Sequence, residues 1–301
     1  MADRVRRLIC LLLVVSLWGL IPIDDVFAAT LTVDDNGLDC PGAPFTTISA
    51  AVLGSAPGDM IVVCNGTYVE QVTINKSVTI AATTGQTPVV MAPATMTLPK
   101  AIMRITGSGV TVRIEGLMIS GPGATACDSL EAGIRVDGGA HAVIRNNRIS
   151  DIRDNPFSSC RNGVGILVGK QSEGATGTAT ILTNIIQGYQ RAGIVVDNAG
   201  SRAVIAENQI TGRGPTSVIS QNGVQVSRGA TGEVTANSIS GHLYTGCGEQ
   251  DAARTGCLQF VAAGLLLFEV RTTDVSQSAN TFRGNQSNVV VVTDLLLAPG
   301  P

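Results

Sequence analysis

Histidine, lysine and aromatic residues are scarce in this sequence of 301 residues, which has two histidines, three lysines and 3% aromatic residues. So few histidines disfavour a histidine-rich metal site, and so few lysines disfavour a lysine nucleophile. No two cysteines have the CxxC spacing, and no cysteine and histidine the CxxH spacing, that are typical of zinc sites. We therefore expect no cofactor and no bound metal ion.

Charge is also sparse, at 14% of residues, and the formal net charge is -3. Nucleic acids and anionic membranes bind basic faces, so neither is expected as the main partner. With 44% hydrophobic residues the chain is too apolar to be disordered. Its 35 glycines, together with many valines, isoleucines, threonines and asparagines, favour β-structure built from short strands and tight turns.

The first 28 residues have the features of a secretory signal peptide. A basic segment (residues 4–7) precedes an apolar run of 16 residues (8–23), and Val26 and Ala28 occupy the positions that a signal peptidase reads. We predict cleavage after Ala28 and export; an uncleaved anchor is the alternative. The run is shorter than the roughly 20 residues of a spanning helix. No later segment is long enough either, so we expect no membrane span after cleavage.

Two short patterns recur along the chain in alternation. In the first, a glycine precedes alternating apolar residues, in segments that begin at Gly133, Gly165, Gly193, Gly223 and Gly264. In the second, a strand ends in Asn-x-apolar, at Asn147, Asn184, Asn208, Asn237 and Asn280. No unit is long enough to bury its own apolar face, whereas stacked units pair each strand with its equivalent one coil later, about 4.8 Å away.

The repeats therefore predict an all-β protein, a parallel β-helix or solenoid. The asparagines are expected to stack as a ladder, and the glycines to let the backbone turn where a Cβ would clash. A β-sandwich is the competing fold, but it would not require the same residue at the same place in each unit.

We expect one domain over residues 29–301. Residues 40–58 are predicted to form an N-terminal cap with a short amphipathic helix, because apolar residues recur at helical spacing after threonines that can cap its start. Coils follow over residues 59–294. The leucine-rich tail, residues 295–301, is predicted to fold over the open edge of the last coil.

Loss of the signal peptide leaves six cysteines, an even number that indicates disulfides formed in an oxidising compartment. Six cysteines allow 15 pairings. The order of the repeats favours pairing between neighbours along the chain: Cys40–Cys64, Cys127–Cys160 and Cys247–Cys257.

The start of the mature chain and its repeats resemble the pectate lyase-like superfamily of right-handed parallel β-helix proteins. The resemblance covers residues 30–294 and rests on Cys40-Pro41, Pro44–Ile48, Ala51, Pro57–Asp59, Gly66–Tyr68 and Glu70–Ile74, followed by the glycine and asparagine coils. It implies a carbohydrate-related role, because many members cleave, de-esterify, epimerise or bind acidic polysaccharides. A fold alone does not fix an activity.

Polar residues on the outward face of the glycine strands are the candidate site. If Ile134 and Val136 point inward, Arg135 and Asp137 point outward, and Asp197 follows in the same register two coils later. Their backbones are then about 10 Å apart. Two carboxyl groups roughly 6.5 to 9.5 Å apart suit an inverting glycosidase, and Arg135 can hold the carboxylate of an acidic sugar. We therefore predict Asp137, Asp197 and Arg135 as catalytic residues.

The opposing interpretation makes both aspartates turn residues, because Gly169 separates them and an aspartate after a strand often bonds its own backbone. The chain lacks the clustered carboxylates of the superfamily's hydrolases and esterases. It also lacks the acidic set of a calcium-dependent lyase and the Asp-Pro-His-Glu motif of the alginate epimerases.

Two further expectations concern the loops that precede the glycine strands. One loop is crowded with charge and is expected to hold a solvated ion-pair network of Asp151, Arg153, Asp154 and Arg161. Tyr189 and Tyr244 are the only obvious aromatic residues in these loops, so stacking on sugar rings is expected to be weak.

Taken with the resemblance, these features predict an exported protein that binds an extracellular, acidic polysaccharide or a cell-surface glycan in a groove on the solenoid. The prediction leaves open whether the bound polysaccharide is also cleaved, in which case the protein would be a hydrolase or a lyase. The alternative is a non-catalytic surface, adhesion or scaffold protein with the same fold.

Overall fold

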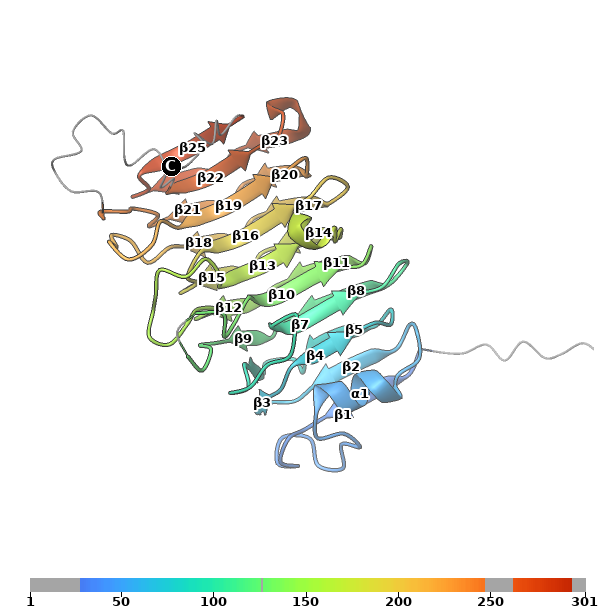
Figure 1. Cartoon of the computed structure of the whole chain (residues 1–301). Helices are drawn as coiled ribbons and strands as arrows, with labels where there is room; N and C mark the ends of the chain where they lie inside the picture. The colour runs from blue at the N-terminus through green and yellow to red at the C-terminus, as the bar shows by residue number, and fades with distance from the viewer. Residues whose placement is uncertain (1–27, 126, 247–261, 294–301) are drawn as a thin grey trace, which may run out of the picture.

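Short strands assemble into three parallel sheets, stacked coil upon coil (Figure 1). This computed structural model describes residues 28–125, 127–246 and 262–293. The predicted signal peptide, the Cys247–Cys257 pair and the predicted C-terminal cap lie outside these residues, apart from Ala28 at the expected cleavage site.

The strands of the three sheets come from equivalent places in successive coils. Sheet A consists of β1 (Thr30–Val33), β2 (Met60–Val63), β5 (Thr79–Ala82), β8 (Thr111–Glu115), β11 (His141–Arg145), β14 (Thr178–Leu182), β17 (Arg202–Ala206), β20 (Thr231–Thr235) and β23 (Val275–Ser278). Sheet B consists of β3 (Thr67–Val69), β6 (Val89–Met91), β9 (Met118–Ser120), β12 (Arg148–Ser150), β15 (Ile185–Gln187), β18 (Gln209–Thr211), β21 (Ser238–Ser240) and β24 (Thr281–Arg283). Sheet C consists of β4 (Val72–Ile74), β7 (Ala101–Thr106), β10 (Ala132–Asp137), β13 (Val164–Val168), β16 (Ala192–Asp197), β19 (Asn222–Ser227), β22 (Ala263–Phe268) and β25 (Ser287–Val292).

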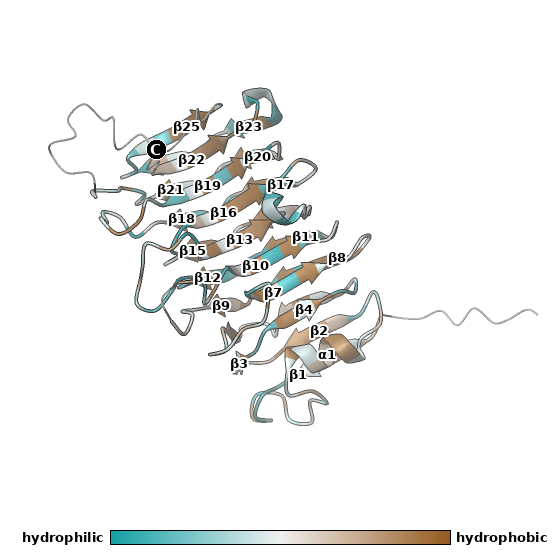
Figure 2. Ribbon diagram, in the orientation of Figure 1, coloured by the Kyte–Doolittle hydropathy of each residue, from teal (hydrophilic) through white to brown (hydrophobic). Residues whose placement is uncertain are grey.

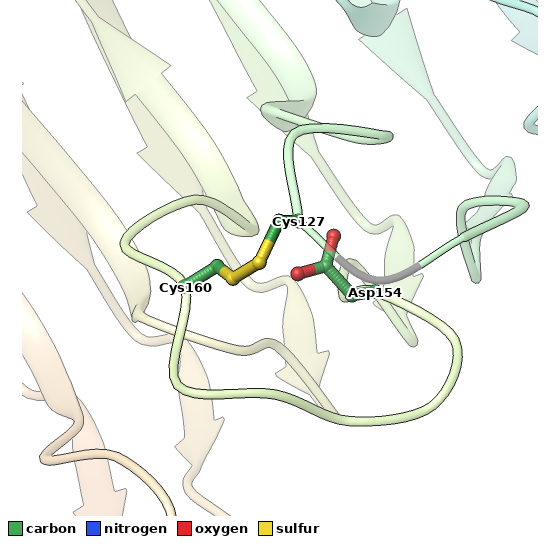
Figure 3. Close-up of side chains that lie close together, drawn as sticks. All are labelled: Cys127, Asp154 and Cys160. Carbon is green, nitrogen blue, oxygen red and sulfur yellow. A yellow bond between two sulfur atoms is a disulfide. The ribbon is translucent and has the colours of Figure 1, made fainter.

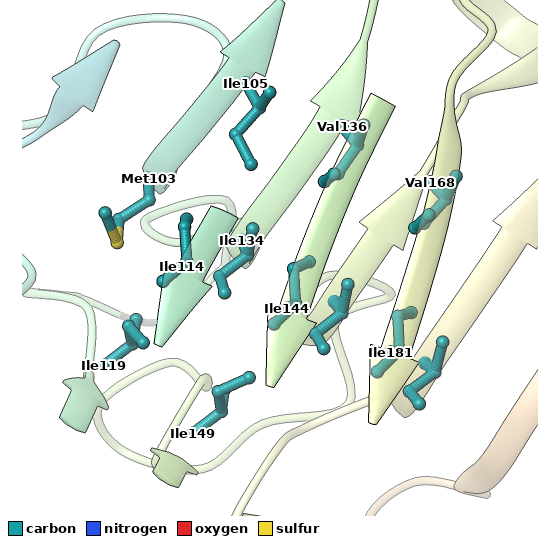
Figure 4. Packing of buried hydrophobic residues seen from close by; sticks show 14 of the residues in the cluster. Met103, Ile105, Ile114, Ile119, Ile134, Val136, Ile144, Ile149, Val168 and Ile181 are labelled. Atoms are coloured by element: carbon teal, nitrogen blue, oxygen red, sulfur yellow. The ribbon is translucent and has the colours of Figure 1, made fainter. Parts of the chain in front are cut away.

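The inward residues of the three sheets fill one continuous apolar core (Figure 4). Register partners on neighbouring coils are alike: Ile134 of β10 lies between Met103 and Ile166, and Ile144 of β11 lies between Ile114 and Ile181. Stacking like upon like buries each side chain against its equivalents along the axis. This confirms the predicted solenoid and excludes the sandwich.

The predicted asparagine ladder is present at the turn between sheets A and B. Asn147 Nδ2 donates to Asn184 Oδ1 at 3.1 Å, and the same bond links Asn184 to Asn208, Asn208 to Asn237 and Asn237 to Asn280 at 3.0 Å each. Each acceptor oxygen also takes the backbone N–H of the preceding asparagine, as Asn184 Oδ1 does from Asn147 N at 3.0 Å. The ladder thus satisfies backbone groups that the turn would otherwise bury unpaired.

The residue before each ladder asparagine has a left-handed backbone, which the sequence pattern did not reveal. The φ angles are 57° at Asn146, 54° at Thr183, 58° at Glu207, 57° at Ala236 and 54° at Ala279. None of these residues is glycine, so the turn is held by the ladder and the flanking strands rather than by local conformational preference.

The glycines that open the strands of sheet C are required by close contact between coils. A Cβ added to Gly165 would lie 2.5 Å from the carbonyl oxygen of Gly193, and one added to Gly193 would lie 2.7 Å from that of Gly223. Glycine is therefore needed at this place because the next coil leaves no room for a side chain. The expected clash of a Cβ is present, but these glycines have no positive φ, so the expected role in turning the backbone is not observed.

The predicted cap is a helix, α1 (Ile48–Gly54), which lies across the first coil (Figure 1). Thr47 caps its start by accepting the Ala50 N–H at 3.2 Å, and Ile48, Ala51 and Val52 enter the core. The predicted disulfide between Cys40 and Cys64 ties the cap to the first coils. Two 3-10 helices, Gln171–Glu173 and Thr272–Asp274, follow strands of sheet C. No helix within the described ranges is long and apolar enough to cross a membrane.

Candidate functional site

The outward face of sheet C changes character along the solenoid axis. At the register position of Arg135 the successive coils carry Arg104, Arg135, Leu167, Val195 and Gln225. The face is therefore cationic on β7 and β10, apolar on β13 and β16, and polar on β19. Figure 2 shows the charged positions as teal segments on β7 and β10.

The three predicted site residues lie on this face, but other side chains cover them. Asp137 and Asp197 follow Val136 and Val196, which are both register partners of Val168, so Gly169 lies between them as expected. The exposed fractions are only 1% for Arg135, 1% for Asp137 and 2% for Asp197. Asp137 pairs with two arginines and Asp197 with a different one.

Arg135 is the centre of a closed network of opposite charges. Its Nε donates to Asp137 Oδ2 at 2.7 Å, its Nη1 to Glu131 Oε2 at 2.9 Å, and its Nη2 to Glu173 Oε2. Lys170 Nζ bridges the same two glutamates, at 2.5 Å from Glu131 Oε1 and 2.7 Å from Glu173 Oε1.

Asp137 extends the network by one cation. Its carboxylate accepts two bonds from Arg104 Nε, at 3.1 and 3.0 Å. Three cations (Arg104, Arg135 and Lys170) thus face three carboxylates (Glu131, Asp137 and Glu173). The network is electrically neutral, because each positive charge is matched by a negative charge within it.

The network also sets the protonation states of its members. Burial disfavours the charged form of Arg135, but its hydrogen bond to Glu173 and the nearby carboxylates outweigh burial and raise the pKa of Arg135. The Arg135 hydrogen bond, helped by Lys170, lowers the pKa of Glu173 from the usual 4.5 to about 2. Glu173 is therefore a stable anion at neutral pH, poorly suited to act as a general acid.

Asp197 is held by a different set of donors. Its oxygens accept from Arg228 Nη2, Gln171 N and Ser227 Oγ, each at 2.8 Å. Burial alone would raise the pKa of Asp197, but these bonds outweigh burial and lower it. Asp197 is therefore also ionised at neutral pH, and its oxygens are occupied by hydrogen bonds from the protein.

A groove with a volume of about 680 Å³ opens on this face, over β13 and β16. Its lining residues are Leu98, Pro99, Lys100, Asp128, Glu131, Arg161, Asn162, Val164, Leu167, Lys170, Ser172, Glu173, Arg191, Val195, Asp197 and Arg228. Val164, Leu167 and Val195 belong to a buried apolar cluster on this outward face, separate from the core, and form an apolar patch in the groove. Of the predicted site residues, Asp197 lines the groove. Arg135 contacts the lining residues Glu131 and Glu173, and Asp137 is linked to them only through Arg135.

Apart from Asp197 and Arg161, the sequence analysis did not identify the charged residues that line this groove. Glu131 and Arg191 both precede Ala-Gly-Ile at the start of a glycine strand, and Lys100 precedes Ala-Ile at the matching place. This repeated position, one residue before the strand, was a usable signal. Glu173 had no such signal, because the 3-10 helix Gln171–Glu173 returns it to the face of β10.

The predicted disulfide Cys127–Cys160 joins the loops that follow β9 and β12 (Figure 3). The groove-lining residues Asp128 and Arg161 come directly after the two cysteines in the chain. The two sulfur atoms and a carboxylate oxygen of Asp154 lie within 4.8 Å of one another. Because the sulfurs are bonded to each other, they do not supply the thiolates that bind a metal ion.

The charged loop before β13 is only in part the solvated ion-pair network that the sequence predicted, because one of its members is buried. Asp154 is fully buried and accepts from Ser158 Oγ at 2.7 Å, Gln190 Nε2 at 2.9 Å and Asn162 Nδ2 at 3.0 Å. Burial opposes its ionisation, but these bonds outweigh burial and lower the pKa of Asp154. Arg153 pairs with Asp151 at 3.3 Å, as expected.

Tyr189 lies in a loop between β15 and β16, as expected, but it is buried. It is 1% exposed and its hydroxyl contacts His242 Nε2, so it cannot stack on a ligand. His242 is fully buried, and its Nδ1 donates to Asn285 Oδ1 at 2.8 Å. Burial lowers the pKa of His242 to about 4. This pair belongs to the interior.

Residues 132–295 match the family described as the right handed beta helix region, and the chain belongs to that family. No curated protein matches it. Pectate lyase Pel9A is similar in structure, with a TM-score of 0.55, 14% identity, and coverage of 91% of this chain and 81% of that one. The complex of XylC with xylose has a TM-score of 0.58, 13% identity, and coverage of 87% of this chain and 63% of that one. At these identities the likeness is one of fold.

Proposed function

We propose that this protein binds an extracellular polysaccharide in the groove on sheet C. The observation that carries the proposal is the groove itself, which combines the apolar residues Val164, Leu167 and Val195 with charged walls. Sugar rings present both apolar C–H faces and hydroxyl edges, and ligand sites commonly pair apolar surface with a few placed polar groups.

The repetition of the coils supports a polymeric ligand. Equivalent strands recur about every 4.8 Å, so the groove has a regular long axis, and solenoids use such extended surfaces for binding. The proteins of similar fold named as a pectate lyase and as a xylose complex are consistent with a sugar ligand, by analogy of fold alone.

Secretion of the mature protein is part of the proposal. The disulfides Cys40–Cys64 and Cys127–Cys160 are typical of an oxidising, extracellular environment. The predicted signal peptide and the single mature domain are consistent with this location.

Binding without cleavage is the form that the contacts favour. Every carboxylate of the predicted catalytic set is engaged: Asp137 by Arg104 and Arg135, and Asp197 by Arg228. A general acid needs a carboxyl group whose pKa is raised towards neutrality, and the pKa of Asp197 is lowered. Catalysis by Asp137, Asp197 and Arg135 stays a prediction beside this proposal.

The binding proposal is tested by blocking the groove. Leu167→Trp places a large ring in the groove, and Leu182→Trp on sheet A is the matched control because Leu182 is only partly buried. Both variants and the wild type are titrated with pectic, alginate and neutral polysaccharides by calorimetry, with circular dichroism to check folding. We expect the Leu167 variant alone to lose binding; unchanged binding by a folded Leu167→Trp protein would contradict the proposal.

Cleavage is tested in the same panel by measuring new reducing ends and unsaturated uronates. Turnover that disappears in Asp137→Asn or Asp197→Asn would establish an enzyme. Binding without turnover is the result that we expect.

A further inference from the structure

The groove contains cations that its carboxylates do not neutralise. Five cationic and four acidic side chains line it. The three carboxylates with ion-pair partners, Glu131, Glu173 and Asp197, are taken by Arg135, Lys170 and Arg228. Across the described part of the chain, neither Arg161 nor Arg191 makes an ion pair or a side-chain hydrogen bond. The groove is locally positive in a protein whose net charge is -3.

The two arginines come from neighbouring coils and start close together. Arg191 N donates to the carbonyl oxygen of Gly163 at 2.9 Å, which places the backbone of Arg191 beside a residue two positions from Arg161. Burial is the main reason that the pKa of Arg191 is lowered; the positive charges of Arg228 and Arg161 lower it further, and the negative charge of Asp197 partly offsets them. Arg191 is half-buried and Arg161 is exposed, and their guanidinium groups are close enough for the charge of one to affect the other.

Both arginines keep guanidinium donors that no carboxylate of the described residues binds, and their like charges repel each other, weakly because solvent reaches Arg161. An anion placed between them removes the repulsion and supplies the missing acceptors. A guanidinium has five donors in a planar fork, which bind the paired oxygens of a carboxylate or the oxygens of a sulfate. The nearby apolar patch of Leu167 and Val195 can support the ring that carries such a group.

We propose that Arg161 and Arg191 form an anion subsite for a carboxylate or sulfate group on a sugar residue of the ligand. The inference rests on the proposed polysaccharide function and gives that function its specificity. Neutral polysaccharides then bind only through the rest of the groove, and charged ones bind more tightly.

The test uses the double variant Arg161→Gln/Arg191→Gln. Its charge-matched control is Arg148→Gln/Arg202→Gln, because Arg148 on β12 and Arg202 on β17 are exposed on sheets B and A. The probes are polygalacturonate and its methyl ester, which separate the effect of the carboxylate, and dextran sulfate and dextran, which separate the effect of sulfate. Dissociation constants are measured at low and high salt.

We expect the double variant to bind the preferred charged polymer roughly tenfold to hundredfold more weakly than the wild type does, and its neutral counterpart equally well. The control variant should keep wild-type affinity. Equal wild-type affinity for charged and neutral polymers would overturn the subsite while leaving polysaccharide binding intact. An equal loss in the control would overturn it too, by assigning the effect to net charge.

A second measurement separates failure of the subsite from failure of the function. Melting temperatures are recorded with free galacturonate, its methyl ester and inorganic sulfate. If no polymer binds but galacturonate or sulfate stabilises the wild type and the control and not the double variant, the anion subsite stands and the polysaccharide is wrong. If neither anion stabilises the wild type, the subsite is overturned.

Discussion

Two neighbouring regions of sheet C contain arginines that differ in whether carboxylates pair with them. On β7 and β10, Arg135 is buried with three carboxylate partners. One and two coils further along, Arg161 and Arg191 face a groove and no ion pair involves either of them within the described ranges. The difference indicates that a matched charge holds this surface together, whereas an unmatched charge is available to a ligand.

The largest effect expected is on stability, from the matched region. Arg135→Met leaves Glu131, Asp137 and Glu173 facing one another without their shared cation, which should lower the free energy of unfolding by about 3 to 5 kcal/mol. Arg191→Met removes a repelled cation and should change the free energy of unfolding by less than about 1 kcal/mol. Urea denaturation measures both changes. Equal decreases in the free energy of unfolding for the two variants would contradict the difference between the regions.

Acid should weaken the matched region and leave the unmatched one unaffected. The pKa of Glu173 is lowered from 4.5 to about 2, so its contribution to stability is complete above pH 4.5 and is lost as the pH falls towards 2. Asp197 contributes in the same direction, because its pKa is lowered from 3.8.

The check is a series of melting temperatures between pH 4.5 and pH 2. The wild type and Arg191→Met should fall steeply and in parallel, while Arg135→Met, which has already lost the pairing, should fall less. Parallel curves for all three proteins would mean that Arg135 does not set the acid response. His242, whose pKa is lowered to about 4, adds a loss at higher pH, between 6.5 and 4, that all three proteins share.

The smallest effect should come from a pair that is neither buried nor in the groove. Arg145 Nη2 lies 2.8 Å from Glu115 Oε2 on sheet A, and the side chains are 39% and 27% exposed. Arg145→Gln should change the free energy of unfolding by no more than about 1 kcal/mol, because solvent screens such pairs. A loss comparable to that of Arg135→Met would show that burial is not what makes the matched network strong.

The sequence predicts the fold well because the same residue recurs at the equivalent position of successive coils. Each ladder asparagine occupies the same turn, and each glycine such as Gly165 meets the next coil at the same point, so spacing alone exposes both. The left-handed residues in these turns cannot be predicted from spacing in this way. Thr183 and Ala236 share a backbone conformation without sharing a side chain.

The site was less predictable because its contacts join residues with no common spacing. The register of Asp137 and Asp197 followed from the strands, but their partners did not. Glu173 reaches Arg135 only through a short helix, and the partner of Asp197 is Arg228 on the next coil. Burial of Tyr189 depends equally on His242, which lies 53 residues away.

The asparagine ladder has a consequence for how such a chain can change length. Asn184 and Asn208 occupy consecutive rungs, and their hydrogen bonds do not depend on how many residues loop out between them. A duplicated or deleted coil therefore preserves the cross-section of the molecule while lengthening or shortening it by about 4.8 Å. Gene rearrangement in steps of one rung would therefore change the length of the solenoid without changing the contacts within each coil.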